Sequence, residues 1–143
     1  METLSELVMI CLLTFLLVKM IRSTERMAYA DPLLDKLKHD LMRLHPKAKE
    51  LRYFASDKSF TEDKKDMFIC LKDENNQYYD ANMLMYVMIH ELAHAISHSY
   101  DDAHTGREFN ENFDLLLKEA SQIGIYDPTI PLLQNYCGVS ADD

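Results

Sequence analysis

An uncharged apolar run near the N-terminus restricts most strongly what this chain of 143 residues can fold into. Residues 7–18 carry no charge, and the apolar span extends from Leu4 to Ile21 if the Lys19 ammonium group reaches the membrane interface. These 18 residues of helix are just enough to cross the hydrocarbon core of a bilayer. A small domain offers little room to bury a helix that is apolar on all sides, so a membrane helix is favoured over a buried core helix.

A cleaved signal peptide is another interpretation of this segment, because residues 28–30 (Ala-Tyr-Ala) have the small-x-small pattern of a cleavage site. Signal peptides begin with a basic cluster, whereas Glu2 and Glu6 precede this apolar run. We therefore expect an uncleaved transmembrane anchor over residues 1–22, followed by a linker over residues 23–30.

Positive residues beside the apolar run indicate an orientation. Lys19, Arg22 and Arg26 all lie at its C-terminal end. Lys and Arg are enriched on the cytosolic side of membrane spans. We therefore expect a single-pass membrane protein whose C-terminal domain, residues 31–143, lies on the cytosolic side.

Charge and cysteine content indicate which partners and which cellular compartment are expected for this chain. The chain has 15 Lys and Arg against 24 Asp and Glu, a net charge of −9. So acidic a chain repels phosphate groups, and we expect no nucleic-acid partner. Cys11, Cys70 and Cys137 lie too far apart for a Cys-x-x-Cys metal or redox motif, and their odd number favours a reducing compartment.

Residues 31–143 have the pattern of one α+β domain, which begins with a scaffold helix and a small sheet. The Asp-Pro pair at residues 31–32 is typical of a helix start, and Pro46 ends this helix. Leucines recur between them at helical spacing: Leu34, Leu37, Leu41 and Leu44. The strand-like runs 51–54 and 67–71 flank a polar loop and predict a small antiparallel sheet, with residues 67–71 as the edge strand beside the cleft.

Two further helices are predicted after the sheet. Asp80 caps a long helix that continues to about Ser97. Residues 105–108 (Thr-Gly-Arg-Glu) form a capping box, in which the Thr105 hydroxyl accepts from the Glu108 amide. The helix that this box begins is expected to stop at Gly124.

The long helix contains the motif that carries chemistry, His90-Glu91-Leu92-Ala93-His94. Two histidines four positions apart project from one helix face and can bind one zinc ion, while Glu91 lies beside the metal's open position. Apolar residues surround the motif: Met83, Leu84, Val87, Met88, Ala95 and Ile96. This setting is typical of a buried zinc helix, and the alternative is a helix whose two histidines are satisfied by core hydrogen bonds.

A catalytic zinc site needs a third protein ligand. His98 shares the helical face, but the eight residues that separate it from His90 correspond to about 12 Å along the axis, so we expect it at the solvent or cleft edge. His104 follows the end of the helix, where the chain can fold back toward the metal, and is the predicted third ligand. A carboxylate ligand is the alternative, and the candidates are Glu111, Glu119, Asp101 and Asp102.

These residues resemble a known family. The motif at residues 90–94, followed by His104 and by Phe109, is similar to that of the SprT-like and WLM minimal zincins, and still more to small metallopeptidases of this type from large DNA viruses. The similarity covers roughly residues 66–138. It includes the segments 66–72, 78–80, 124–127 and 135–138. The gap of nine residues between His94 and His104 is longer than in many WLM members.

The resemblance implies a compact zincin fold with zinc on His90, His94 and His104, and with Glu91 as the catalytic base. SprT-like and WLM proteins are associated with proteolysis of DNA-bound proteins. The apolar anchor, the acidic domain and a sequence without zinc-ribbon cysteines argue against that role here.

We therefore expect zinc-dependent hydrolysis of a protein or peptide substrate. Zinc would polarise the scissile carbonyl and acidify water, while Glu91 accepts the proton and passes it to the leaving amine. Tyr100, Tyr126 and Tyr136 are candidates for an oxyanion contact, and spacing does not choose among them. The alternative is a structural protein, for instance of a virion membrane, in which zinc stabilises the zincin fold without catalysis.

The anchor also predicts where the domain acts. A short linker holds the domain within a few nanometres of the bilayer, so the expected substrates are membrane proteins, virion proteins or proteins assembled against a membrane. The net charge of −9 predicts repulsion from anionic lipid headgroups, so that the domain stands off the surface and favours substrates with basic segments.

Overall fold

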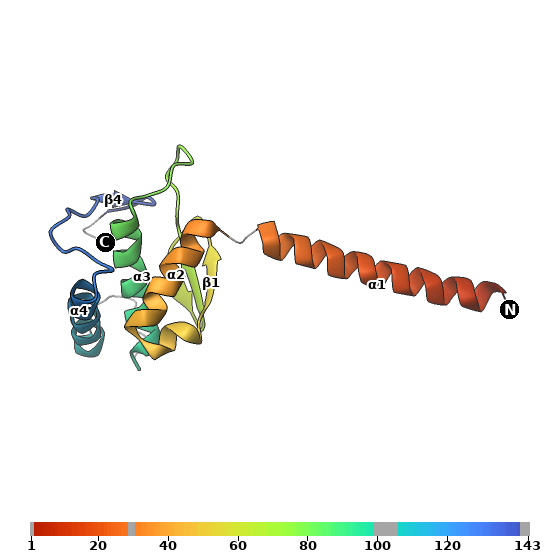
Figure 1. The fold of residues 1–143 in the computed structure, drawn as a ribbon, viewed down its shortest axis with the longest axis horizontal. Coiled ribbons are helices and arrows are strands. Elements are labelled where there is room, and N and C mark those ends of the chain that lie inside the picture. Colours follow the sequence, from red (N-terminus) through yellow and green to blue (C-terminus); the bar gives the residue numbers. More distant parts are fainter. Residues whose placement is uncertain (1, 29–30, 99–105, 141–143) are drawn as a thin grey trace. The chain divides into compact units, whose positions relative to one another are not determined.

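The computed structural model describes residues 2–28, 31–98 and 106–140, which belong to two units, Met1–Asp31 and Pro32–Asp143 (Figure 1). The first unit is a helix, α1 (Glu2–Ala28). Its segment Thr3–Arg22 is long and apolar enough to span a membrane, and none of that segment is buried. The helix continues through most of the predicted linker, because residues 23–28 contain neither Pro nor Gly to end it.

The second unit begins with α2 (Pro32–Leu44), as predicted from the Asp-Pro pair. Leu34, Leu37 and Leu41 are buried on one face of this helix, which confirms the helical spacing of the leucines. A 3-10 turn, η1 (Pro46–Lys49), follows at once.

The sheet has three strands, β1 (Arg52–Ala55), β2 (Phe60–Glu62) and β3 (Asp66–Ile69), in the order β1-β3-β2. β1 runs parallel to β3, and β2 runs antiparallel to it. The prediction of an antiparallel sheet with residues 67–71 at its edge is therefore wrong, because β2 lies inside the predicted polar loop and makes β3 the central strand.

The missed strand depends on a tight hairpin. Asp63 and Lys64 both have positive φ, 50° and 55°, as the central residues of a type I′ turn require. The Asp63-Lys64 pair is not one of the Asn-Gly or Asp-Gly pairs that mark such a turn in a sequence. The three residues of β2 are also too few to show the alternation of a strand.

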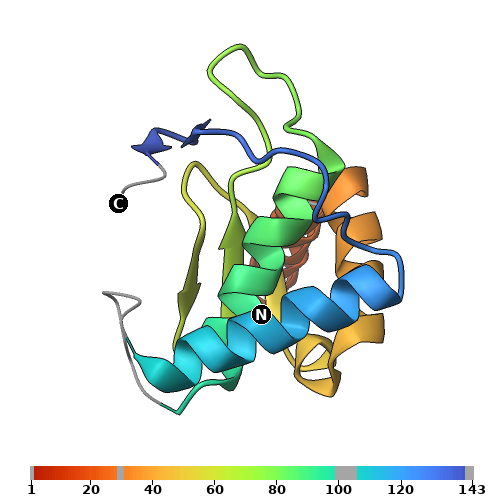
Figure 2. The ribbon, with the colours of Figure 1, turned by 90° about the vertical axis from the view of Figure 1, so that its left-hand side faces the viewer.

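The central helix of the domain is α3 (Ala81–Ile96), which contacts the sheet and α2 as well as α4 (Arg107–Gln122). Figure 2 shows α4 crossing α3, with the strands to one side of α3 and α2 to the other. The predicted cap is confirmed, since the Asp80 carboxylate accepts from the amides of Asn82 and Met83. The α+β class is also confirmed, with four helices and a small mixed sheet in the described residues.

The start of α4 differs from the prediction. Gly106 is its N-cap residue and makes no side-chain cap bond, while Thr105 lies outside the described residues. Glu108 turns back toward the end of α3 and accepts from the His98 amide at 2.8 Å. The end of the helix is as predicted, because Ile123 caps it and Gly124 follows with φ of +79°.

A C-terminal hairpin, β4 (Asn135–Tyr136) and β5 (Val139–Ser140), is tied to the end of β3 by a disulfide between Cys70 and Cys137. The Tyr136 hydroxyl donates to the Cys70 carbonyl and lies 2.8 Å from the Ser59 hydroxyl. This disulfide pair disagrees with the reducing compartment expected from the odd number of cysteines, because disulfides are rare in such compartments. The tertiary fold joins two cysteines separated by 67 positions, and no local spacing predicts such a pair.

Candidate metal centre

His90 and His94 lie on successive turns of one face of α3, as their spacing predicted. Their ring centroids are 5.0 Å apart, with an angle of 74° between the ring planes. Both side chains are half-buried. Imidazole nitrogens are preferred zinc ligands, so this pair fits two positions of a tetrahedral zinc site.

Helix α4 covers the histidine pair with aromatic rings. The Phe109 ring lies 4.4 Å from the ring of His94 and 5.1 Å from that of His90. The Phe113 ring lies 5.2 Å from the ring of His90. These contacts form an apolar wall beside the imidazoles, which lowers the local dielectric constant and fixes the ring positions.

The carboxylates that α4 could offer as a third ligand are not brought to the pair. Glu111 instead forms an ion pair with Arg107, with 2.6 Å between Oε1 and Nε. Within residues 2–28, 31–98 and 106–140, no group of three or more His, Cys, Asp or Glu side chains could hold a metal. Neither Glu111 nor Glu119 is therefore grouped with the histidines.

The predicted third ligand, His104, lies outside the described residues, as do Asp101 and Asp102. The two histidines of the helix thus fit zinc by donor type and spacing, and the third donor stays a prediction. His98 is 96% exposed, which confirms its predicted place in solvent.

Glu91 is buried, with 5% of its surface exposed, on the side of α3 that faces β2. The Thr61 hydroxyl lies 2.6 Å from Oε2 of Glu91 and 3.2 Å from the Glu91 carbonyl oxygen, and donates toward both. Burial raises the pKa of Glu91 to about 7, and the hydrogen bond from Thr61 opposes part of this rise. A carboxyl group with this pKa exchanges its proton near neutral pH, as a general base must.

Sequence reasoning missed Thr61 as a partner of Glu91. The residue lies in the middle of β2, which was expected to be loop. The only local signal was the short alternation Phe60-Thr61-Glu62, which is too brief to stand out.

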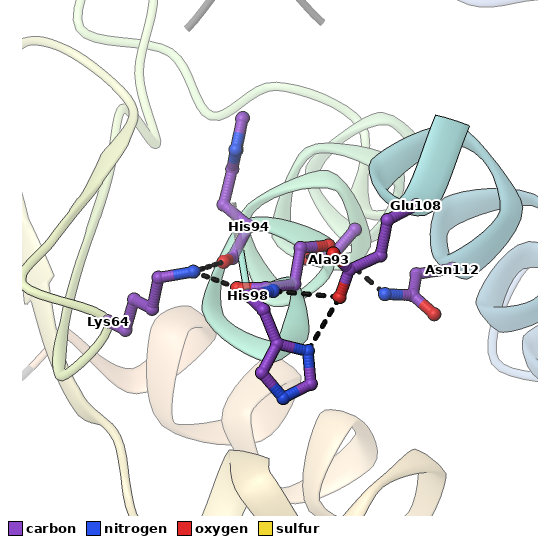
Figure 3. A network of polar contacts seen from close by, with 7 residues as sticks. Lys64, Ala93, His94, His98, Glu108 and Asn112 are labelled. Carbon is purple, nitrogen blue, oxygen red and sulfur yellow. Dashed lines mark hydrogen bonds and ion pairs between the residues drawn. The ribbon is translucent and has the colours of Figure 1, made fainter. Parts of the chain in front are cut away.

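The C-terminal end of α3 is held by a polar network that sequence reasoning also missed (Figure 3). Lys64 reaches from the β2–β3 turn, and its Nζ donates to the carbonyl oxygens of Ser97 and, at 3.3 Å, of His94. The Ser97 hydroxyl donates to the Ala93 carbonyl at 2.7 Å and accepts from the Asn112 amide at 3.1 Å. A cation at the last carbonyls of a helix stabilises its end, here within four residues of His94.

Glu108 completes this network from α4. Its Oε1 accepts from the backbone amide of His98 and lies 2.8 Å from the His98 ring nitrogen Nδ1 (Figure 3). His98, the last described residue before residue 106, is thereby joined to the first turn of α4.

The tyrosines proposed as oxyanion partners have other contacts. The Tyr136 hydroxyl is buried against Cys70 and Ser59, and burial raises its pKa to about 12. Tyr126 is buried at 9% exposure, and its ring lies 6.0 Å from that of Tyr86. Tyr100 lies outside the described residues.

Comparison with known proteins finds viral relatives. The chain is 40% identical over 91 residues to uncharacterized protein 136R of Invertebrate iridescent virus 6, a match that covers 62% of this chain and 49% of the relative. It is 38% identical over 90 residues to uncharacterized protein 042R of Invertebrate iridescent virus 3, covering 62% and 55%. An uncharacterized protein of Acanthamoeba polyphaga mimivirus is 36% identical over 94 residues, covering 59% and 44%. The chain thus spans about half the length of the curated relatives it matches. No family model and no solved structure matches the chain.

Proposed function

We propose that this chain is a zinc-dependent peptidase of the SprT-like and WLM minimal zincin type, held at a membrane by α1. The observation that carries the proposal is the pair His90 and His94, with ring centroids 5.0 Å apart, on the same helix that buries the carboxyl group of Glu91. A helix that carries two imidazoles and also buries a carboxyl group keeps a costly polar group in the core, which a purely structural helix would not need.

His90, His94 and His104 would hold the metal in this proposal. Zinc bound there supplies Lewis-acid chemistry, which polarises a peptide carbonyl and lowers the pKa of water. Glu91 accepts a proton at its carboxylate and returns it to the leaving amine. Thr61 holds Oε2 of Glu91 in place through the hydrogen bond of 2.6 Å.

The surroundings of these residues support a hydrolytic role. Phe109 and Phe113 place an apolar wall against the imidazoles, and Lys64 stabilises the helix end just after His94. Such supporting contacts orient metal ligands and tune their basicity. The α+β order of scaffold helix, sheet, motif helix and following helix agrees with a small zincin, by analogy of fold alone.

The proposed location is a membrane, crossed once by residues 3–22. The flanking residues Lys19, Arg22 and Arg26 support a domain on the cytosolic side. The Cys70–Cys137 disulfide opposes this orientation, since disulfides persist mainly in oxidising compartments. Protease protection of the domain in sealed vesicles tests the orientation: digestion from the cytosolic side supports it, and protection contradicts it.

The viral relatives support a viral role. The proposed substrates are therefore virion proteins or other proteins assembled against a membrane. No nucleic-acid partner is proposed, because the net charge is −9.

The proposed activity is tested by peptide cleavage with zinc-loaded wild-type protein and two variants. Glu91→Gln removes the base and should reduce cleavage by about a thousandfold. Glu111→Gln is the matched control, because it removes an exposed carboxylate on α4 and should leave cleavage unchanged. Equal cleavage by wild type and Glu91→Gln, or none by the wild type on a broad peptide library, would favour a structural zincin-fold protein instead.

A further inference from the structure

Two side chains of opposite charge hold one peptide group at the end of α3 (Figure 3). Lys64, in the β2–β3 turn, donates from Nζ to the carbonyl oxygen of Ser97. Glu108, in the first turn of α4, accepts at Oε1 from the backbone amide of His98 at 2.8 Å. The carbonyl and the amide belong to the same peptide bond, so a cation lies at its oxygen and a carboxylate at its N–H. Both contacts are favourable, because the peptide dipole is negative at oxygen and positive at the N–H.

The held peptide lies where the chain leaves α3. Ser97 is the C-cap residue of this helix and already has extended backbone angles, with φ of −77° and ψ of 139°. Its buried hydroxyl donates to the Ala93 carbonyl at 2.7 Å and accepts from the Asn112 amide at 3.1 Å. Side chains from the β2–β3 turn and from α4 therefore fix the direction in which the chain continues after α3.

The same contacts close the chain between α3 and α4. His98 and Glu108 are ten positions apart, and the His98 ring nitrogen Nδ1 also lies 2.8 Å from Oε1 of Glu108. The segment between them carries His104, the predicted third ligand. A segment whose ends are already joined has less conformational entropy to lose when one of its side chains binds a metal.

The joined ends lie beside the histidine pair of α3. Phe109 follows Glu108 directly, and its ring lies 4.4 Å from the ring of His94. From Phe109 the chain runs back about 5 Å along α4 to Gly106, and the two positions from there to His104 span at most about 7 Å. Fixing the ends of the segment therefore keeps a donor at position 104 close to the His94 imidazole.

We propose that Lys64 and Glu108 are positioning residues of the metal centre, which direct the chain after α3 so that His104 meets the zinc ion. This inference rests on the proposed function, because it requires His104 to be the third ligand. Neither charged side chain touches metal or substrate, and both act through the peptide group that they hold. Removal of such outer partners typically weakens metal binding by about ten- to a hundredfold.

A simpler role for the two charges is stabilisation of the helices. Glu108 lies at the N-terminal end of α4 and Lys64 at the C-terminal end of α3, where charges of these signs are favourable without any metal. Helix stabilisation alone predicts that any loss of zinc affinity is independent of His104. The two roles thus differ in whether the effect of each charge depends on that histidine.

A double-mutant cycle with zinc affinity as the readout separates the two roles. Full-length wild type, Glu108→Ala, His104→Ala and the double variant are purified in detergent, and the zinc dissociation constant is measured by competition with a chromophoric chelator. Lys64→Met repeats the cycle from the β2–β3 turn. Glu111→Ala is the control, since Glu111 is an exposed carboxylate near the same end of α4. Circular dichroism checks that each variant keeps the helix content of the wild type.

We expect Glu108→Ala and Lys64→Met each to weaken zinc binding about tenfold when His104 is present and less than about twofold in the His104→Ala background, with Glu111→Ala unchanged. Equal weakening in both backgrounds, or no weakening by either variant, would overturn the inference and leave the proposed zinc site intact. Wild-type affinity in His104→Ala would overturn the third ligand and this inference together. A wild type that binds no zinc would overturn the proposed function as well.

Discussion

Removal of the Cys70–Cys137 disulfide should destabilise the domain strongly. The bond closes a loop across 67 positions. The loss of chain entropy in the unfolded state corresponds to about 4 kcal/mol at 25 °C for a loop of this length. The hydrogen bonds of Tyr136 to the Cys70 carbonyl and the Ser59 hydroxyl involve no sulfur atom, so we expect them to hold the C-terminal hairpin near the end of β3 after reduction.

Urea unfolding of a chain that begins at Asp31 measures this effect. Such a chain keeps every described core residue and excludes Cys11, so a reductant acts on one bond alone. We expect reduction, or the Cys137→Ser substitution, to lower the unfolding midpoint by roughly 2 M or more. The control is the double variant Cys70→Ser with Cys137→Ser, whose midpoint should not respond to reductant. Two free thiols in the oxidised protein, or equal midpoints with and without reductant, would refute the reasoning.

Three further outcomes follow from particular contacts. Thr61→Val removes the hydrogen bond to Glu91 and should reduce kcat by about tenfold or more. The zinc content, measured by mass spectrometry, should stay unchanged. A loss of zinc would contradict a role of Thr61 that is limited to Glu91. Lys64→Met removes the cation from the end of α3 and should lower the free energy of unfolding by about 1 kcal/mol in urea titrations, whereas Lys65→Met, at an exposed neighbour, should not. Folding raises the pKa of Tyr136 from 10 to about 12, so the folded state favours the neutral phenol. The contribution of this group to the free energy of unfolding is complete below pH 10 and is lost as the pH rises through 12. Tyr136→Phe should remove part of this alkaline loss, and an unchanged pH profile would disprove the assignment.

The helices were predictable because their signals are local. Pro32, Asp80 and Gly124 lie at helix ends, where their backbone or side-chain chemistry is favoured. The pairing of His90 with His94 also follows from helix geometry, since residues four apart share a face.

The remaining features depend on contacts between distant segments. β2 is defined by its pairing with β3, and without β2 the contact from Thr61 to Glu91 could not be foreseen. The link from Glu108 to His98 crosses from α4 to α3, whereas the sequence pattern had paired Glu108 locally with Thr105 in a capping box. The disulfide likewise requires the C-terminal hairpin to return to the end of β3.

Zinc content is the measurement that tests the central claim most directly. Wild-type protein, Glu91→Gln and His94→Ala are purified with zinc, dialysed and compared by mass spectrometry of the metal. The account predicts about one zinc per chain in the wild type and in Glu91→Gln, and a large loss in His94→Ala. Wild-type protein without bound zinc, or His94→Ala with the same zinc content as the wild type, would contradict it.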